Sequence, residues 1–342
     1  MAGARVGRFR ILARVPARRR SALRRGVLRR HLAAGVTGPV PVVAVVGPTA
    51  TGKTALSLDL AEALGGEVVN ADSMQLYEGM DIGTAKLRVG ERRGIAHHVF
   101  DIWQVTEPAS VAEYQARARA AITDIAARGR VPLLVGGSGL YIRAVLDDFS
   151  FPGTDPDLRA TLEAELAEVG PGPLHARLAS LDAAAAARIL PSNGRRIVRA
   201  LEVIELTGAP FTAELPGERP YHPALQLGVD RDPADLDTRV NRRVELMWEE
   251  GLVAEVEHLI VRGLREGRTA SRALGYQQVI AFLDGQCDEQ TAAADTSRAT
   301  RRFVRRQRSW FRRDPRITWL NAASPDVVTT AMVAVEEWRR SF

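Results

Sequence analysis

The sequence is nearly free of cysteine. Its 342 residues include a single one, Cys287, which excludes a disulfide framework and any zinc site made of several cysteines. No apolar run approaches the roughly 20 residues of a membrane-spanning helix, and no secretory signal segment is present. These absences predict a protein of the reducing cytoplasm that has no membrane anchor.

Lysine is the second scarce residue. Among 47 basic residues only Lys53 and Lys86 are lysine, and all the others are arginine. Lys53 stands in the segment VVAVVGPTATGKT (42–54), where β-branched residues lead into a Gly-x-x-x-x-Gly-Lys-Thr pattern. The compact lysine ammonium fits such a loop, whereas a planar guanidinium would crowd it.

The pattern predicts a strand, a tight loop and the start of a helix, with backbone N–H groups that converge on a phosphate. The helix expected over 55–64 points its positive end at this site. The hydroxyl of Thr54 is the predicted protein ligand of a Mg²⁺ ion. The predicted phosphate-binding residues are Gly47, Pro48, Thr49, Ala50, Thr51, Gly52, Lys53 and Thr54.

Acidic residues are absent from the first 38 residues, which contain 11 arginines. The formal net charge of +6 therefore reflects this segment and says little about the rest of the chain. An RNA-attracting disordered arm, an organelle presequence and an addition from an upstream start codon are three interpretations. We favour a disordered extension without a dedicated role.

The remaining chain alternates short apolar strands with helical segments, which predicts an α/β fold with a right-handed crossover. Asp72 follows the expected strand 67–70, and Ser138 follows the expected strand 131–135, at the sheet edge where ligands collect. Asp72 is a candidate magnesium ligand, proton acceptor or turn cap. Ser138 is a candidate phosphate contact or helix cap. The paired histidines 97 and 98 are interpreted as loop packing.

A helical texture between Pro152 and about Pro216 predicts an insertion that carries Arg195, Arg196 and Arg199 on one turn. Such a cluster is either a solvated face or a track for nucleic-acid phosphates. The helix expected over 296–313 carries eight arginines, and its Phe303 and Trp310 are expected to face the core. The predicted parts are an extension (1–38), the first part of the α/β core (39–150), a helical insertion (151–216) and the second part of the core (217–342).

Seven segments in order, GPTATGKT, NADSMQLY, DIGTAK, GGSGLY, RRIVRALE, RALGYQQ and RRQRSWFRR, resemble the bacterial-type tRNA dimethylallyltransferase family. The resemblance implies a P-loop NTPase-like parallel sheet flanked by helices, with a helical insertion domain that grips the anticodon stem-loop. It also implies the reaction: a dimethylallyl group passes from dimethylallyl diphosphate to N6 of the adenosine 3′ of the anticodon, and diphosphate leaves. Mg²⁺ is the implied cofactor, and we expect a monomer.

The resemblance further implies roles for individual residues. Asp72 matches the general base, Lys53 and Arg243 hold the diphosphate, and Ser138 stands where many members have threonine. Arg306 and Gln307 are expected to line the channel. The implied tRNA contacts are Asp72, Ser73, Met74, Gln75, Ser138, Arg159, Arg195, Arg196, Arg199, Arg272, Gly275, Tyr276 and Gln277.

Two other functions share parts of this pattern. A small-molecule P-loop kinase has the same phosphate loop and parallel sheet, but it also needs nucleotide-base recognition and an arginine-bearing lid. A non-catalytic RNA-binding module would account for the arginine content, but not for Lys53, Thr54 and Asp72. Transfer of γ-phosphate from ATP, or binding without a prenylated product, separates these alternatives from the transferase.

Overall fold

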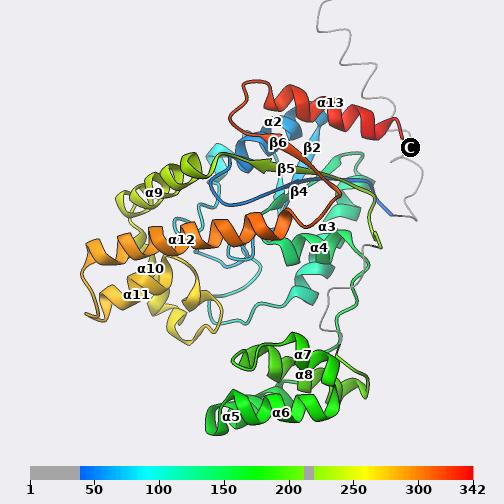
Figure 1. Cartoon of the computed structure of the whole chain (residues 1–342). Helices are drawn as coiled ribbons and strands as arrows, with labels where there is room; N and C mark the ends of the chain where they lie inside the picture. The colour runs from blue at the N-terminus through cyan, green and yellow to red at the C-terminus, as the bar shows by residue number, and fades with distance from the viewer. Residues whose placement is uncertain (1–38, 212–218, 342) are drawn as a thin grey trace, which may run out of the picture.

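The computed structural model describes residues 39–211 and 219–341 and contains one six-stranded parallel sheet (Figure 1). The extension predicted over 1–38 lies outside the described residues. The strand order is β3-β2-β4-β1-β5-β6, and every neighbouring pair is parallel. The predicted α/β class with a parallel sheet is therefore confirmed. The strands are β1 (Val42–Val46), β2 (Gly66–Asn70), β3 (His97–His98), β4 (Val131–Gly136), β5 (Ala224–Asp230) and β6 (Ile317–Asn321).

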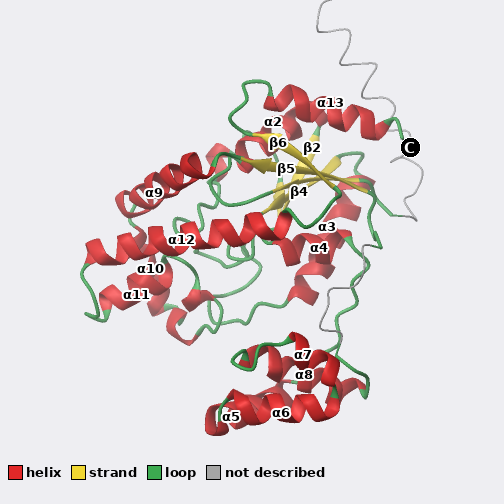
Figure 2. Cartoon of the chain, in the orientation of Figure 1, coloured by secondary structure: helices red, strands yellow, loops and turns green. Residues whose placement is uncertain are grey.

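Helices cover both faces of the sheet (Figure 2). Side chains of β1 alternate between two hydrophobic clusters, because successive residues of a strand point to opposite faces. Val43 and Val45 pack against α2 (Lys53–Leu64) and α13 (Val327–Arg339). The other face packs against α3 (Val111–Ala127), α4 (Gly139–Leu146) and the end of α12 (Glu289–Phe311). Burial on both faces explains why β1 is apolar throughout.

Four helices between α4 and β5 form a separate body, which lies below the sheet in Figure 1. Their apolar side chains make a hydrophobic cluster of their own, distinct from the two clusters on the sheet. They fall within the predicted insertion and are α5 (Pro156–Val169), α6 (Pro171–Leu181), α7 (Ala183–Arg188) and α8 (Gly194–Thr207).

The second part of the core supplies three more helices beside α12. They are α9 (Pro233–Glu249), α10 (Leu252–Val261) and α11 (Tyr276–Leu283). Short 3₁₀ turns span Leu264–Glu266 and Ala270–Arg272 in this part, and a third spans Val89–Glu91 in the first part of the core. No helix within the described ranges is both long enough and apolar enough to span a bilayer.

Helix α12 differs from its prediction in both length and buried face. It begins at Glu289, well before the predicted start, because Asp288 caps it by accepting a hydrogen bond from the backbone N–H of Thr291 (2.7 Å). Its buried face near the sheet consists of Val304, Gln307 and Phe311. Trp310 is 38% exposed, so the expectation that it faces the core is wrong.

The paired histidines form the edge strand β3, which corrects their interpretation as loop packing. The Nε2 atom of His98 lies 2.7 Å from a carboxylate oxygen of the buried Glu67. Arg128 also binds this carboxylate, and its hydrogen bond lowers the pKa of Glu67. Glu67 thus secures the edge strand to the end of α3.

His222 is buried in a neutral state. Its Nδ1–H donates to the carbonyl of Val40 (3.0 Å), while Nε2 has no partner among the residues that the structure describes. Burial lowers the pKa of His222 from 6.5 to about 4. A proton added to Nε2 would place an unpaired cation in the core.

Acidification is therefore expected to destabilise the protein through His222. The unfolded chain binds the proton near pH 6.5 and the folded chain only near pH 4, so this contribution is complete above pH 6.5 and is lost as the pH falls. The loss amounts to about 3 kcal/mol. Urea unfolding at pH 7 and pH 4.5 measures it, and His222→Asn should show a smaller pH effect than the wild type. An equal pH effect in both proteins would exclude His222 as the cause.

Candidate functional site

The phosphate loop (47–52) joins β1 to α2 and depends on left-handed backbone conformations. Gly47 has φ 139°, Gly52 has φ 100°, and Ala50 between them has φ 67°. A Cβ atom at Gly47 would lie 2.4 Å from the carbonyl oxygen of Val229. Glycine is therefore the residue that fits where the loop leaves the sheet.

Cationic side chains bind three carbonyl groups of the phosphate loop. Lys53 Nζ donates to Pro48 O (2.7 Å), Arg239 Nε to Ala50 O (2.8 Å) and Arg231 Nε to Thr51 O (3.1 Å). Carbonyl oxygens would repel an anion, so their pairing with cations makes the loop more favourable for one. The sequence pattern did not indicate the contributions of Arg231 and Arg239.

Gln307 connects the phosphate loop to the loop after β4. Its Oε1 accepts from the N–H of Thr49 (2.9 Å), and its Nε2 donates to the carbonyl of Gly137 (3.0 Å). The side chain is buried, with 6% exposed. The prediction that Gln307 lines a channel is therefore corrected: it is a bridge between two loops, whereas Arg306 is exposed.

Gln307→Leu is expected to weaken binding of inorganic diphosphate about tenfold. The change leaves the Thr49 N–H and the Gly137 carbonyl unpaired, and each such loss costs about 1–3 kcal/mol. Calorimetry with diphosphate and Mg²⁺ measures the effect. Gln290→Leu, at an exposed position of the same helix, is the matched control and should bind normally. Equal affinities of the two variants would contradict the bridging role.

Asp72 lies just beyond β2 with its carboxylate held on one side. Its Oδ1 accepts from the N–H of Met74 (3.1 Å), and its own N–H donates to Asn70 Oδ1 (3.0 Å). Within residues 39–211 and 219–341, Oδ2 has no hydrogen-bond partner. The carboxylate is thus oriented and retains one oxygen that is able to accept a proton.

Lys53, Arg243 and Asp72 are close enough to affect one another electrostatically. The pKa of Lys53 is lowered to about 8, mainly by loss of hydration on burial; the charge of Asp72 opposes this shift and the charge of Arg243 adds to it. Burial also lowers the pKa of Arg243, against the attraction of Asp72. Arg243 is anchored by a hydrogen bond to Thr84 O (3.0 Å). Two cations beside one carboxylate suit a polyanionic ligand.

Ser138 ties the loop after β4 to the loop after β2. Its Oγ accepts from the N–H of Ser73 (3.0 Å) and lies 3.2 Å from Ser73 Oγ. Although it precedes α4, it makes no side-chain capping bond, so the capping alternative is wrong. A Cβ at Gly136 would lie 2.1 Å from Ala71 O, which shows how closely the two strand ends approach. A contact of Ser138 with a phosphate stays a prediction.

The arginines predicted to contact RNA on the insertion do not form one stripe. Arg159 and Arg199 both bind Glu202, whose side chain is completely buried. Arg195 and Arg196 lie exposed on α8. Arg159 and Arg199 therefore have a role within the insertion, whereas the other two present their side chains at its surface.

The RALGYQQ segment is similarly divided. Arg272 and Gln277 are exposed, whereas Gly275 and Tyr276 are buried. The hydroxyl of Tyr276 donates to Glu255 Oε1 (2.6 Å). A direct contact of the Tyr276 ring with RNA is incompatible with this burial, so that prediction is corrected.

Thr54 is exposed at the start of α2. No group of three or more His, Cys, Asp or Glu side chains in the described part of the chain is arranged to hold a metal ion. Mg²⁺ keeps several waters and is commonly bound through substrate phosphates with one or two protein groups. A single hydroxyl beside the phosphate loop fits an ion that arrives with a diphosphate.

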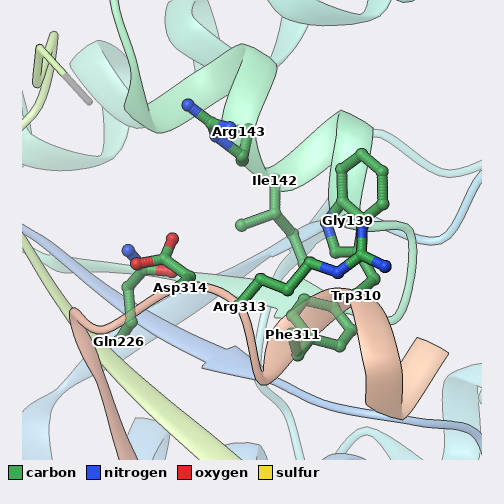
Figure 3. A pocket seen from close by; sticks show the side chains of 8 residues that line it. All are labelled: Gly139, Ile142, Arg143, Gln226, Trp310, Phe311, Arg313 and Asp314. Carbon is green, nitrogen blue, oxygen red and sulfur yellow. The ribbon is translucent and has the colours of Figure 1, made fainter. Parts of the chain in front are cut away.

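A cavity of about 140 Å³ opens between α4 and the end of α12 (Figure 3). Arg143, Gln226, Trp310 and Arg313 are among the residues around it. The indole of Trp310 lies so close to Gly139 that a Cβ there would be 2.0 Å from its Nε1. None of the predicted catalytic residues lines this cavity, so it is distinct from the phosphate loop.

Comparison with known proteins places these features in a family. The IPP transferase family model matches residues 75–314. A tRNA dimethylallyltransferase of Salinispora arenicola is 70% identical over 294 residues, which are 86% of each chain. A second one, of Streptomyces avermitilis, is 63% identical over 298 residues, covering 87% of this chain and 96% of the relative.

Solved structures agree with this assignment. The tRNA isopentenylpyrophosphate transferase of Bacillus halodurans is 40% identical, with a TM-score of 0.65 over 88% of this chain and 98% of that one. A eukaryotic dimethylallyltransferase described as acting on tRNA is 25% identical, with a TM-score of 0.77 over 88% and 80% of the two chains. The family resemblance seen in the ordered motifs is thereby confirmed, and the chain belongs to the IPP transferase family.

Proposed function

We propose that this protein transfers a dimethylallyl group from dimethylallyl diphosphate to N6 of the adenosine immediately 3′ of the anticodon in tRNA. The observation that carries the proposal is the position of Asp72 beside the two cations Lys53 and Arg243 at the phosphate loop. The names of the relatives, tRNA dimethylallyltransferase, support the same activity.

The phosphate loop stabilises a leaving group in this reaction. The allylic C–O bond breaks, the new C–N bond forms at N6, and diphosphate departs with the electron pair. Lys53, Arg243 and the backbone N–H groups of the loop stabilise the negative charge that develops on the departing diphosphate. When bound at Thr54, Mg²⁺ supplies further charge neutralisation on the diphosphate oxygens.

Asp72 accepts the proton that N6 must lose after alkylation. Its Oδ1 is held by the N–H of Met74, so Oδ2 is presented in a fixed orientation. The attacking exocyclic amine is a weak nucleophile, and a carboxylate within hydrogen-bond reach both orients it and removes its proton. The adenine has to leave the stacked loop to reach this group.

The exposed cations and amides away from the loop are the candidate RNA contacts. Arginines hold phosphates, while an amide such as that of Gln277 is able to bind a base edge in a single-stranded loop. The protein acts as a monomer in the cytoplasm under this proposal. The candidate contacts are Arg195, Arg196, Arg272, Gln277 and Arg306.

Mass spectrometry of nucleosides from one tRNA, incubated with the protein, dimethylallyl diphosphate and Mg²⁺, tests the activity. The expected product is N6-dimethylallyladenosine, formed in step with released diphosphate. Transfer of γ-phosphate from ATP to an acceptor, without a prenylated nucleoside, would overturn the proposal in favour of a kinase. The relatives do not favour the kinase, because they are named as transferases acting on tRNA.

A further inference from the structure

The carboxylate of Glu255 binds three consecutive backbone N–H groups of a distant loop. Oε2 accepts from Asp81 (3.2 Å) and Ile82 (2.7 Å), and Oε1 accepts from Gly83 (3.2 Å). The hydroxyl of Tyr276 donates to Oε1 as well (2.6 Å). Four hydrogen bonds to one side chain are far more than a solvated glutamate on a helix surface requires. Glu255 therefore fixes the conformation of this loop.

The bound loop comprises residues 81–86, the DIGTAK segment. Its glycine is required by close packing, since a Cβ at Gly83 would lie 2.5 Å from the ring of Tyr276. The loop is closed on itself by the buried Lys86, whose Nζ donates to Tyr77 O (2.9 Å) and Asp81 Oδ1 (2.6 Å). Its conformation is thus set from two sides.

The opposite side of the 81–86 loop faces the reaction site. The carbonyl of Thr84 accepts from the guanidinium of Arg243 (3.0 Å) and from Nε2 of Gln75 (3.1 Å). Arg243 belongs to the cluster at the phosphate loop, and Gln75 follows Asp72 in the segment expected to hold the target base. The carbonyl of Thr84 therefore orients two side chains: Arg243 for the prenyl donor and Gln75 for the target base.

We infer that Glu255 is a positioning residue: by holding the 81–86 loop, it places Arg243 against the departing diphosphate and Gln75 against the adenine. The inference rests on the proposed function for the identity of these two ligands. It also gives a physical reason for two motifs, because the glycine of DIGTAK and the tyrosine of RALGYQQ meet at this carboxylate.

Glu255→Gln tests the inference, because the amide retains one acceptor oxygen and replaces the other with a donor that faces N–H groups. We expect the KM for dimethylallyl diphosphate to rise about tenfold or more, with a lower kcat per folded enzyme. Tyr276→Phe removes one hydrogen bond and retains the ring, so its effect should be smaller but in the same direction. Glu257→Gln, at an exposed position of the same helix, is the matched control and should behave as the wild type.

The double variant separates positioning from general support of the fold. If Glu255 acts through Arg243, Glu255→Gln should weaken inorganic diphosphate binding in the wild-type background and have little further effect in an Arg243→Met background. A merely structural role would lower the folded fraction and leave the KM unchanged. Unchanged KM values, or the same fold-loss of diphosphate affinity in both backgrounds, would overturn the inference. Should Glu255→Gln fail to fold, Tyr276→Phe is measured in the same two backgrounds.

Failure of the proposed function has a different signature. In that case the wild type makes no prenylated nucleoside, while calorimetry with inorganic diphosphate still reports whether Glu255 controls Arg243. Normal wild-type turnover, combined with a Glu255→Gln variant that has unchanged KM and diphosphate affinity, would contradict the positioning role alone.

Discussion

Replacement of Asp72 by alanine is expected to lower turnover by about 10²- to 10⁴-fold, the range typical of a lost general base. The substitution removes the carboxylate oxygen that is free to accept the N6 proton, while the contacts made by the exposed arginines remain. Affinity for tRNA should therefore change far less than kcat. Single-turnover rates and filter binding with the same tRNA measure the two quantities separately.

Asp72→Asn provides the control for orientation. Its amide is able to accept the Met74 N–H hydrogen bond through oxygen but cannot take up a proton. It should resemble alanine in turnover. Near-normal turnover of either variant would remove Asp72 from the mechanism.

Replacement of Lys53 by alanine is expected to raise the KM for the prenyl donor and to lower kcat, with a combined loss of about 10²- to 10³-fold in kcat/KM. The ammonium group interacts with the diphosphate in the ground state and more strongly as charge develops on it. Lys53→Arg should not restore activity, because the planar guanidinium does not fit under a loop whose carbonyl at Pro48 lies 2.7 Å from Nζ. Unchanged kinetics in Lys53→Ala would contradict the assignment.

The same residue gives the binding of diphosphate a pH dependence. In the protein without ligand, Lys53 has a pKa of about 8. When diphosphate is bound, the Lys53 side chain must carry the proton that pairs with the anion. Affinity is therefore complete below pH 8 and should fall by up to about tenfold per pH unit above it, as one proton is taken up on binding. Diphosphate itself titrates in this range, so the comparison is with Lys53→Met, which should lack the additional dependence.

The phosphate loop was predictable from the sequence because its requirements are local. Left-handed backbone at Gly47 and Gly52 restricts the residues that fit, and the strand and helix around them have clear periodic patterns. Asp72 and Ser138 were found for a related reason, since parallel strands bring their carboxyl ends to one edge. The structure assigns Ser138 to Ser73 and not to a helix cap, a choice that local sequence left open.

Residues whose partners lie far away in the sequence were misjudged or missed. Gln307 was expected in a channel, but it bridges to Gly137, which is 170 residues away. Tyr276 was expected at the RNA, but it is buried against Glu255. Arg159 was expected to contact RNA, but it binds the buried Glu202, which is 43 residues away. In each case a polar residue type was recognised and its environment was not.

The sequence alone determined the parallel α/β fold, the phosphate loop and the family, because these depend on short segments whose backbone geometry and spacing restrict the residues they accept. The tertiary structure alone decided which polar side chains face the site and which ones hold its loops in place without facing it. Glu255 has no motif around it, and its three N–H partners lie more than 170 residues earlier in the chain. Such contacts arise from packing between elements that are close only in the folded chain, so neither the periodicity of the sequence nor local propensity predicts them.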